Sequence, residues 1–575
     1  MHGSRGAVLV ALVLLGLGGV VGPAMAAPST APSPAAVARP TMDAANPTTG
    51  DAPLVGQQPA AENASNATAG NHPPDPPHDV IGWENGYWYN ETLGFNQSGG
   101  LTPAELNATV ARTEARVEYL RHLEFNHTVP VEIKSRQWYQ EQTANHTVSA
   151  TLRTFDNAKF EALFLVGEDQ NSITVQNQNS GSDVLGYYSP SEQAIVIISD
   201  NPSTLQLNEV TLAHELTHAL QDQHFNLSRY DARTRDQVNG QNGLIEGDAH
   251  LIEGRYRERC DAGGAWNGTC LVPSASFGGG GGGGGSLANI GVYIMKYQPY
   301  SDGPAFVTAL YRRGGWAAVD AAYANPPDSA EQVMDPQRYP GDQPVNVTFA
   351  DTQRSGWTRV RPPNRPDYAT LGESALTAML VYPLYDSSGQ AQIISPSHWL
   401  NTTADGSLST FDPLNYSNKY VDGWKGDSLH VYRNDANQTA YVWKLVWDTP
   451  TDAQQFLDGY RQVLQYWGGH QVRPGVWVIQ NGKFADAFAI RVDGNAVTIV
   501  NAPTVADLPD VRAGAATTPT ATPSPTATAV ATTTGDDPTA ATTVATTTTS
   551  GQPGFGALAA LVCLLVGAVA WRRWN

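Results

Sequence analysis

Hydrophobic and polar positions follow two different periods along the chain. The segment 103–125 has the spacing of an amphipathic helix, and Thr102 and Glu105 form a capping box at its start. The segment 205–222 has the same helical spacing with more apolar positions. The segment 184–199 instead has strand-forming aromatic and β-branched runs on either side of a Ser-Pro turn, which is typical of a β-hairpin. These patterns predict a mixture of helices and strands.

The C-terminal half of the chain carries a second group of such patterns. A helical segment at 304–323, interrupted by Gly314 and Gly315, comes first. Further on, the pattern predicts a helix at 452–467 and strands at 429–433, 439–447, 476–480, 485–492 and 496–500. We therefore predict an α+β protein in which a larger domain over 79–366 precedes a smaller α+β accessory domain over 367–512.

Both ends of the chain carry segments that do not build a folded core. An apolar stretch followed by an Ala-x-Ala site ending at Ala26 is typical of a secretory signal peptide over residues 1–26. Residues 27–78 are rich in Ala, Pro, Asn and Thr, which predicts a disordered leader. Residues 513–552 form a Thr-, Ala- and Pro-rich stalk, and residues 553–575 contain a short apolar, transmembrane segment followed by arginines. We expect an exported protein held at the outer face of the cell membrane.

Charge and cysteine content narrow the possible functions. The chain has 54 acidic and 34 Lys and Arg residues in 575, a net charge of −20, which excludes nucleic acid as a partner because phosphate binding depends on cationic side chains. Three cysteines are too few for a disulfide-built scaffold. In an exported chain, Cys260 and Cys270 are expected to form one local disulfide. The uninterrupted glycine run 278–285 predicts a flexible loop.

The most specific chemical pattern is His214-Glu215-Leu216-Thr217-His218 within the predicted helix 205–222. Residues four apart on a helix lie on the same face, so both histidines can bind one Zn²⁺ ion while Glu215 stands beside them as a general base. A histidine pair at this spacing also occurs on solvated surface helices. The apolar positions around this pair favour a buried site, and they are Val210, Leu212, Ala213, Leu216, Ala219 and Leu220.

A zinc site of this kind needs a third protein ligand, and an acidic segment at 244–253 can supply it. Glu246 is the expected ligand, and Glu253 on the same face is the reserve. Asp248 or Asp222 could instead accept a hydrogen bond from a histidine ligand and orient it.

The segments 211–225 and 244–249 together resemble the gluzincin branch of zinc metallopeptidases. The resemblance implies a zincin-like domain over 79–366, with helices and a small mixed sheet that has an edge strand. It implies His214, His218 and Glu246 as zinc ligands and Glu215 as the catalytic base. The strand Gly186-Tyr187-Tyr188 resembles the edge strand that holds substrate backbone in zincins. Zincins also stabilise an oxyanion, and the candidates for this role are Tyr187, Tyr188, Tyr256, Tyr323 and Tyr339.

The C-terminal tail resembles the PGF-CTERM sorting signal of archaeal surface proteins. Pro553, Gly554 and Phe555 follow the stalk and precede the apolar run and the terminal arginines. In that family an archaeosortase processes the motif and a lipid anchors the protein. The tail resemblance therefore implies archaeosortase and the membrane as partners. Most of the chain from residue 80 to about 508 also resembles a family of haloarchaeal surface proteins.

These observations support more than one function. The first is a cell-surface zinc peptidase that hydrolyses a peptide or protein substrate with a zinc-activated water. The second is a non-catalytic surface or adhesion glycoprotein in which the zincin fold is structural, since thirteen N-x-S/T sequons predict glycosylation. A glycan-binding ectodomain is a third, suggested by the many aromatic residues.

Overall fold

The structure is a computed structural model that describes residues 73–144, 148–181, 186–199, 201, 204–272, 287–354 and 356–515. The predicted signal peptide, the sorting motif Pro553-Gly554-Phe555, the glycine run 278–285 and nearly all of the leader and stalk lie outside these ranges. Within them, no helix combines the length and apolar character that crossing a membrane requires.

The fold is α+β, as the sequence predicts. The helices are α1 Pro103–Arg121, α2 Arg136–Ala144, α3 Ala150–Ala162, α4 Ser172–Gly181, α5 Glu209–Phe225, α6 Arg235–Cys260, α7 Ile290–Ala324, α8 Ala330–Met334, α9 Gly372–Asp386, α10 Pro396–Trp399, α11 Pro450–Tyr466 and α12 Leu508–Val511. The strands are β1 Trp83–Glu84, β2 Tyr87–Trp88, β3 Val131–Ser135, β4 Gly186–Ser189, β5 Ala194–Ser199, β6 Trp357–Arg359, β7 Trp424–Asn434, β8 Thr439–Trp447, β9 His470–Arg473, β10 Val476–Val478, β11 Ala487–Asp493 and β12 Ala496–Ala502.

A small mixed sheet and three long helices form the N-terminal part of the fold. Its strand order is β3-β5-β4, with β3 parallel and β4 antiparallel to β5, so β4 lies at an edge. Helix α1 begins with the predicted capping box: the Thr102 hydroxyl accepts from the Glu105 backbone, and the Glu105 carboxylate accepts from the Thr102 backbone. Helix α5 packs between α1 and α6 and against β4 and β5.

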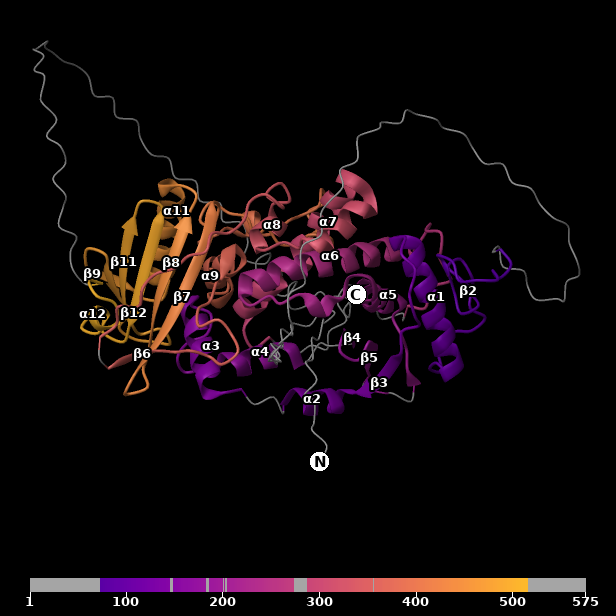
Figure 1. Ribbon diagram of the computed structural model, residues 1–575, viewed down its shortest axis with the longest axis horizontal. Helices are drawn as coiled ribbons and strands as arrows, with labels where there is room; N and C mark the ends of the chain where they lie inside the picture. The colour runs from indigo at the N-terminus through magenta and orange to yellow at the C-terminus, as the bar shows by residue number, and fades with distance from the viewer. Residues whose placement is uncertain are drawn as a thin grey trace, which may run out of the picture.

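The C-terminal part is built on a seven-stranded antiparallel sheet with strand order β6-β7-β8-β12-β11-β10-β9. Figure 1 shows this sheet at one end of the molecule, α1 and β2 at the other, and α6 and α7 between them. Strand β6 at 357–359 already belongs to the sheet, so this unit begins before the predicted boundary at 367.

Residues of both predicted domains form one hydrophobic core beside the large sheet, and a separate core surrounds α1, α5 and α6. Phe160 from α3 and Met295 from α7 are fully buried together with Trp443 and Phe456, which come from β8 and α11. Figure 1 shows α3 beside the large sheet although about 270 residues separate it in sequence from β7. Residues of the region 79–366 therefore contribute to the hydrophobic core of the C-terminal sheet.

Helices α6 and α7 approach each other closely through two glycines. A Cβ atom built on Gly247 would lie 2.2 Å from the backbone oxygen of Gly303, which no side chain tolerates. This contact lies directly beside Glu246 on α6. Helix α7 then breaks at Gly314 and Gly315, as predicted, because both residues have non-helical backbone angles.

We predict that Gly247→Ala destabilises the protein by about 1–3 kcal/mol, because the added methyl group must push α6 and α7 apart. The matched control is Gly254→Ala on the same helix, where nothing lies within 4 Å of the added atom. That change is expected to stabilise by about 0.5–1 kcal/mol, the ordinary gain of alanine over glycine in a helix. Urea unfolding of the purified chain measures both, and equal effects would contradict the close-contact explanation.

Candidate metal centre

Helix α5 is fixed at its start and buried along its length. Its N-cap is Asn208, whose side chain accepts hydrogen bonds from the backbone amides of Val210 and Thr211. The apolar positions predicted to face the core are all buried in the structure. The predicted histidines therefore project from a helix whose orientation is set by its N-cap and by the packing of its apolar side.

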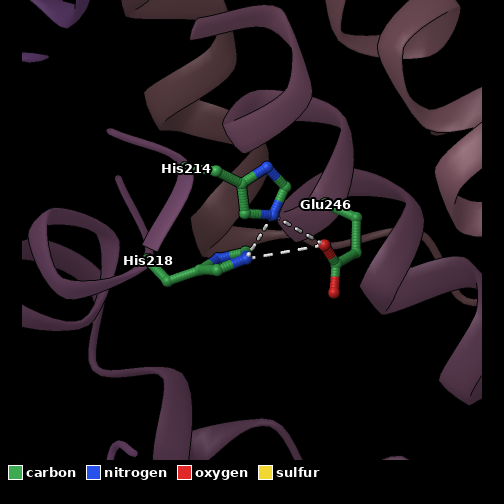
Figure 2. A group of neighbouring side chains, drawn as sticks. All are labelled: His214, His218 and Glu246. Carbon is green, nitrogen blue, oxygen red and sulfur yellow. Dashed lines mark hydrogen bonds and ion pairs between the residues drawn. The ribbon is translucent and has the colours of Figure 1, made fainter. Parts of the chain in front are cut away.

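Three side chains from α5 and α6 converge on one point. The Nε2 atoms of His214 and His218 lie 3.1 Å apart, and Oε2 of Glu246 lies 3.5 Å from each of them. Figure 2 shows the two rings and the carboxylate pointing toward one another. None of the three is more than 1% exposed.

The donor set fits a zinc ion. Two imidazole nitrogens and one carboxylate oxygen are the ligand types that zinc binds in sites with three protein ligands. Oε2 of Glu246 is buried and has no hydrogen-bond partner among the described residues, although polar atoms in an interior are normally paired. Burial would raise the pKa of Glu246, but the neighbouring imidazoles hold it well below its usual range, so the carboxylate is available as an anion. A cation at this point would satisfy all three atoms.

Each of the three groups is also held from its outer side. Nδ1 of His214 lies 3.1 Å from Oε2 of Glu253, and Nδ1 of His218 lies 2.9 Å from Oε1 of Gln221. The Tyr300 hydroxyl donates to Oε1 of Glu246 at 2.8 Å. Such outer contacts fix the ring tautomer and leave the Nε2 atoms free to ligate.

The structure pairs the acidic candidates Asp222 and Asp248 with groups other than the two imidazole rings. Asp222 accepts hydrogen bonds from the Tyr188 hydroxyl at 2.9 Å and from the Leu227 backbone at 2.7 Å. Asp248 pairs with Arg121 of α1 at 3.0 Å and accepts from the Tyr323 hydroxyl. Neither orients a histidine ligand. Glu253, expected as the reserve ligand, contacts the far nitrogen of His214 instead and so acts as its orienting group.

Glu215 lies between the metal centre and the edge strand. Its Oε2 accepts a hydrogen bond from the Tyr188 backbone amide at 2.8 Å, whereas its Oε1 is buried without a partner among the described residues. Burial raises the pKa of Glu215 to about 7, and the two nearby imidazoles oppose that rise. One oxygen is thus anchored while the other can receive a proton.

The predicted edge strand is β4, which pairs with β5 and lies at the edge of its sheet. The proposed oxyanion groups do not gather at the centre. The hydroxyl groups of four candidates bond elsewhere: Tyr188 to Asp222, Tyr256 to Glu209, Tyr323 to Asp248 and Tyr339 to the Asn325 backbone. The Tyr187 ring is buried against Tyr139.

A cavity of about 160 Å³ adjoins Glu215. Gly186 of β4, Thr211 of α5 and Glu215 line it. The rest of the lining is mainly aliphatic and comes from β5, the segment before α5 and α5 itself, including Ile195, Ile197, Leu205, Leu207 and Leu212. Its size and lining suit an apolar side chain.

Three residues of the site were not among the sequence candidates. Gln221 is three residues after His218, so helical spacing could have found it. Tyr300 is 54 residues from Glu246 and reaches it only through the packing of α6 and α7, which leaves no signal in the sequence. The ring of His250 lies 4.6 Å from that of His214, and its Nδ1 lies 3.1 Å from Glu253.

Comparison with known proteins bears on the C-terminal part of the chain. A family model described as a domain of unknown function, DUF8575, matches residues 358–512. This range begins at β6 and ends after α12, so it covers the seven-stranded sheet and does not include α5 or α6. No curated protein and no solved structure matches the chain.

We predict that Glu253→Gln lowers zinc affinity by about 10–100-fold, because His214 loses the carboxylate that orients its ring. The matched control is Asp222→Asn, which removes a carboxylate near the C-terminal end of α5 that contacts no imidazole. Competition with a chromogenic chelator measures the affinity of each variant. If both substitutions weaken zinc binding equally, Glu253 does not have this orienting role.

Proposed function

We propose that the chain is a zinc-dependent hydrolase of peptide bonds with a gluzincin-like centre. The observation that carries the proposal is the convergence of His214, His218 and Glu246 at one buried point, with Glu215 beside them. A purely structural role for this group would not require a second buried carboxylate with an unpaired oxygen.

Zinc held by this group would supply Lewis acidity, which makes water nucleophilic near neutral pH and polarises a carbonyl group. Glu215 accepts the proton of the attacking water at Oε1 and delivers it to the leaving amine. Its Oε2 stays bonded to the Tyr188 amide, which keeps the carboxylate in position through both transfers. Glu253 and Gln221 hold the two rings, so the geometry is set before substrate arrives.

Strand β4 and the adjoining cavity suggest how a peptide is held. A peptide in extended conformation can pair with a strand at a sheet edge through backbone hydrogen bonds. The β4 strand runs beside Glu215, so a peptide bound there passes the metal centre. One of its side chains next to the cleaved bond enters the aliphatic cavity.

The cellular location of the protein is part of the same proposal. The signal-like N-terminus, the sequons and the PGF-CTERM-like tail support an exported glycoprotein attached to the outer face of the membrane after processing by an archaeosortase. The substrate is then a peptide or protein outside the cell.

We predict that Glu215→Gln retains zinc but lowers peptide hydrolysis by about 10²–10⁴-fold, because the general base is lost while the ligands remain. Zinc content by elemental analysis and cleavage of an unfolded protein measure the two properties separately. The matched control is Glu192→Gln, an exposed residue in the turn between β4 and β5. Stoichiometric zinc without hydrolysis in the unsubstituted chain would favour the non-catalytic surface glycoprotein.

We also predict a preference for an aliphatic side chain next to the cleaved bond. A peptide with leucine at that position is expected to have a kcat/KM roughly 10–200-fold above its glycine analogue, since the leucine fills the cavity. Thr211→Phe places a ring in the cavity wall and should remove most of this preference while leaving zinc content unchanged. An unaltered leucine-to-glycine ratio in the variant would show that the cavity does not receive the side chain.

A further inference from the structure

A second group of acidic side chains lies away from the metal centre, where α1 meets the segment that precedes it. Its members are Asp79, Glu84, Glu114, Glu118 and Glu124, and we call them the N-terminal carboxylate cluster. Glu114 and Glu118 lie one turn apart on α1 and are 0% exposed, and Glu84 on β1 is 4% exposed. Acidic side chains are rarely buried to this extent without a cationic partner.

Three members of the cluster could bind one cation directly. Asp79, Glu84 and Glu124 each offer a carboxylate oxygen, and these three oxygens all lie within 4.8 Å of one another. Asp79 is exposed and Glu124 half-buried, so the group opens to solvent on one side. An ion can therefore enter without unfolding of the surrounding chain.

The two buried glutamates on α1 hold the segments that carry these oxygens. Oε2 of Glu118 accepts from the Gly82 backbone at 2.9 Å, and its Oε1 accepts from the Phe125 backbone at 2.8 Å. Gly82 is two residues before Glu84, and Phe125 directly follows Glu124. Glu118 therefore fixes both segments relative to α1 before any ion binds.

An unpaired oxygen points to a missing partner. Oε1 of Glu114 accepts from the Val129 backbone at 3.1 Å, but its Oε2 is buried with no hydrogen-bond partner in the described ranges. Oε1 of Glu124 is likewise buried and unpaired. Unsatisfied buried oxygens cost free energy unless a proton, water or cation completes them.

The charge of the cluster is also uncompensated. Within the described part of the chain, none of its five carboxylates forms a salt bridge with Lys, Arg or His. Burial, together with the neighbouring carboxylates, raises the pKa of Glu114 to about 8 and that of Glu84 to about 7. Repulsion between neighbouring carboxylates favours their protonated forms, and a bound divalent cation would remove that repulsion.

We propose that the N-terminal carboxylate cluster is a Ca²⁺ site, with Asp79, Glu84 and Glu124 as ligands and Glu114 and Glu118 as the buried support. All three donors are carboxylate oxygens, and a set without a histidine or cysteine ligand suits a hard cation better than zinc. Calcium tolerates irregular coordination by six to eight oxygens, so water completes the shell on the open side. Bound calcium fixes β1 and β2 to α1, and α1 in turn packs on α5.

Terbium luminescence tests the site directly. Tb³⁺ replaces Ca²⁺ at oxygen sites, and Trp83 adjoins Glu84, so excitation of tryptophan should sensitise a terbium ion held here. We expect the full-length chain to show sensitised emission that Ca²⁺ displaces, and a higher thermal unfolding midpoint in Ca²⁺ than in chelator. Absence of both effects would overturn the proposal and leave a cluster that holds only protons.

Two variants make the test specific. The double substitution Asp79→Asn with Glu124→Gln removes two ligands but keeps the backbone contacts of Glu118, and it should weaken Ca²⁺ binding by at least about tenfold. The control Asp75→Asn removes a nearby carboxylate that bonds the Trp83 indole and lies outside the three-oxygen group, and it should leave binding unchanged. Unaltered Ca²⁺ binding in the double variant would refute the assignment. Zinc content is measured alongside and should be equal in all three proteins, so this test is independent of the peptidase proposal.

Discussion

The arrangement of the metal centre depends on one buried carboxylate, Glu209, in the first turn of α5. It accepts two hydrogen bonds from Arg112, at 2.8 and 2.7 Å, and one from Arg116 at 2.8 Å, and it also binds the Tyr256 hydroxyl of α6. The Leu271 backbone donates to it as well, next to the disulfide between Cys260 and Cys270 that the sequence predicts. Removal of one partner from a buried ion pair of this kind costs about 3–5 kcal/mol, so α1, α5 and α6 are strongly held in one relative position.

Helix α1 consequently packs against elements of both proposed ion sites. Arg112, Arg116 and Arg121, all at most 1% exposed, pair with carboxylates of α5 and α6. Glu114 and Glu118 instead turn toward the N-terminal segment. The arginines of α1 are held by carboxylate partners, whereas its buried glutamates accept from backbone amides. Loss of order in the N-terminal segment would therefore disturb the candidate metal centre, because α1 packs on both.

Sequence patterns predicted the elements with strong local signals. The capping box of α1, the hairpin β4–β5, the helix that bears His214 and His218 and the break at Gly314 all occur where the pattern put them. Helix α9 was not predicted, because it is buried almost throughout and so shows no alternation of apolar and polar positions. Strand β6 joins the large sheet by pairing with β7 although it precedes residue 367, and its three residues are too few to form a strand pattern in the sequence.

The sequence by itself determined which face of α5 carries His214 and His218, since a spacing of four residues on a helix fixes the direction of two side chains whatever surrounds them. Its acidic partner at Glu246 could be proposed because the acidic segment is also helical. Tertiary structure alone decided the roles of the remaining carboxylates: Glu253 meets His214, whereas Asp248 and Asp222 meet Arg121 and Tyr188. Those choices depend on how α1, α6 and β4 pack on α5, and local spacing does not specify contacts between separate elements.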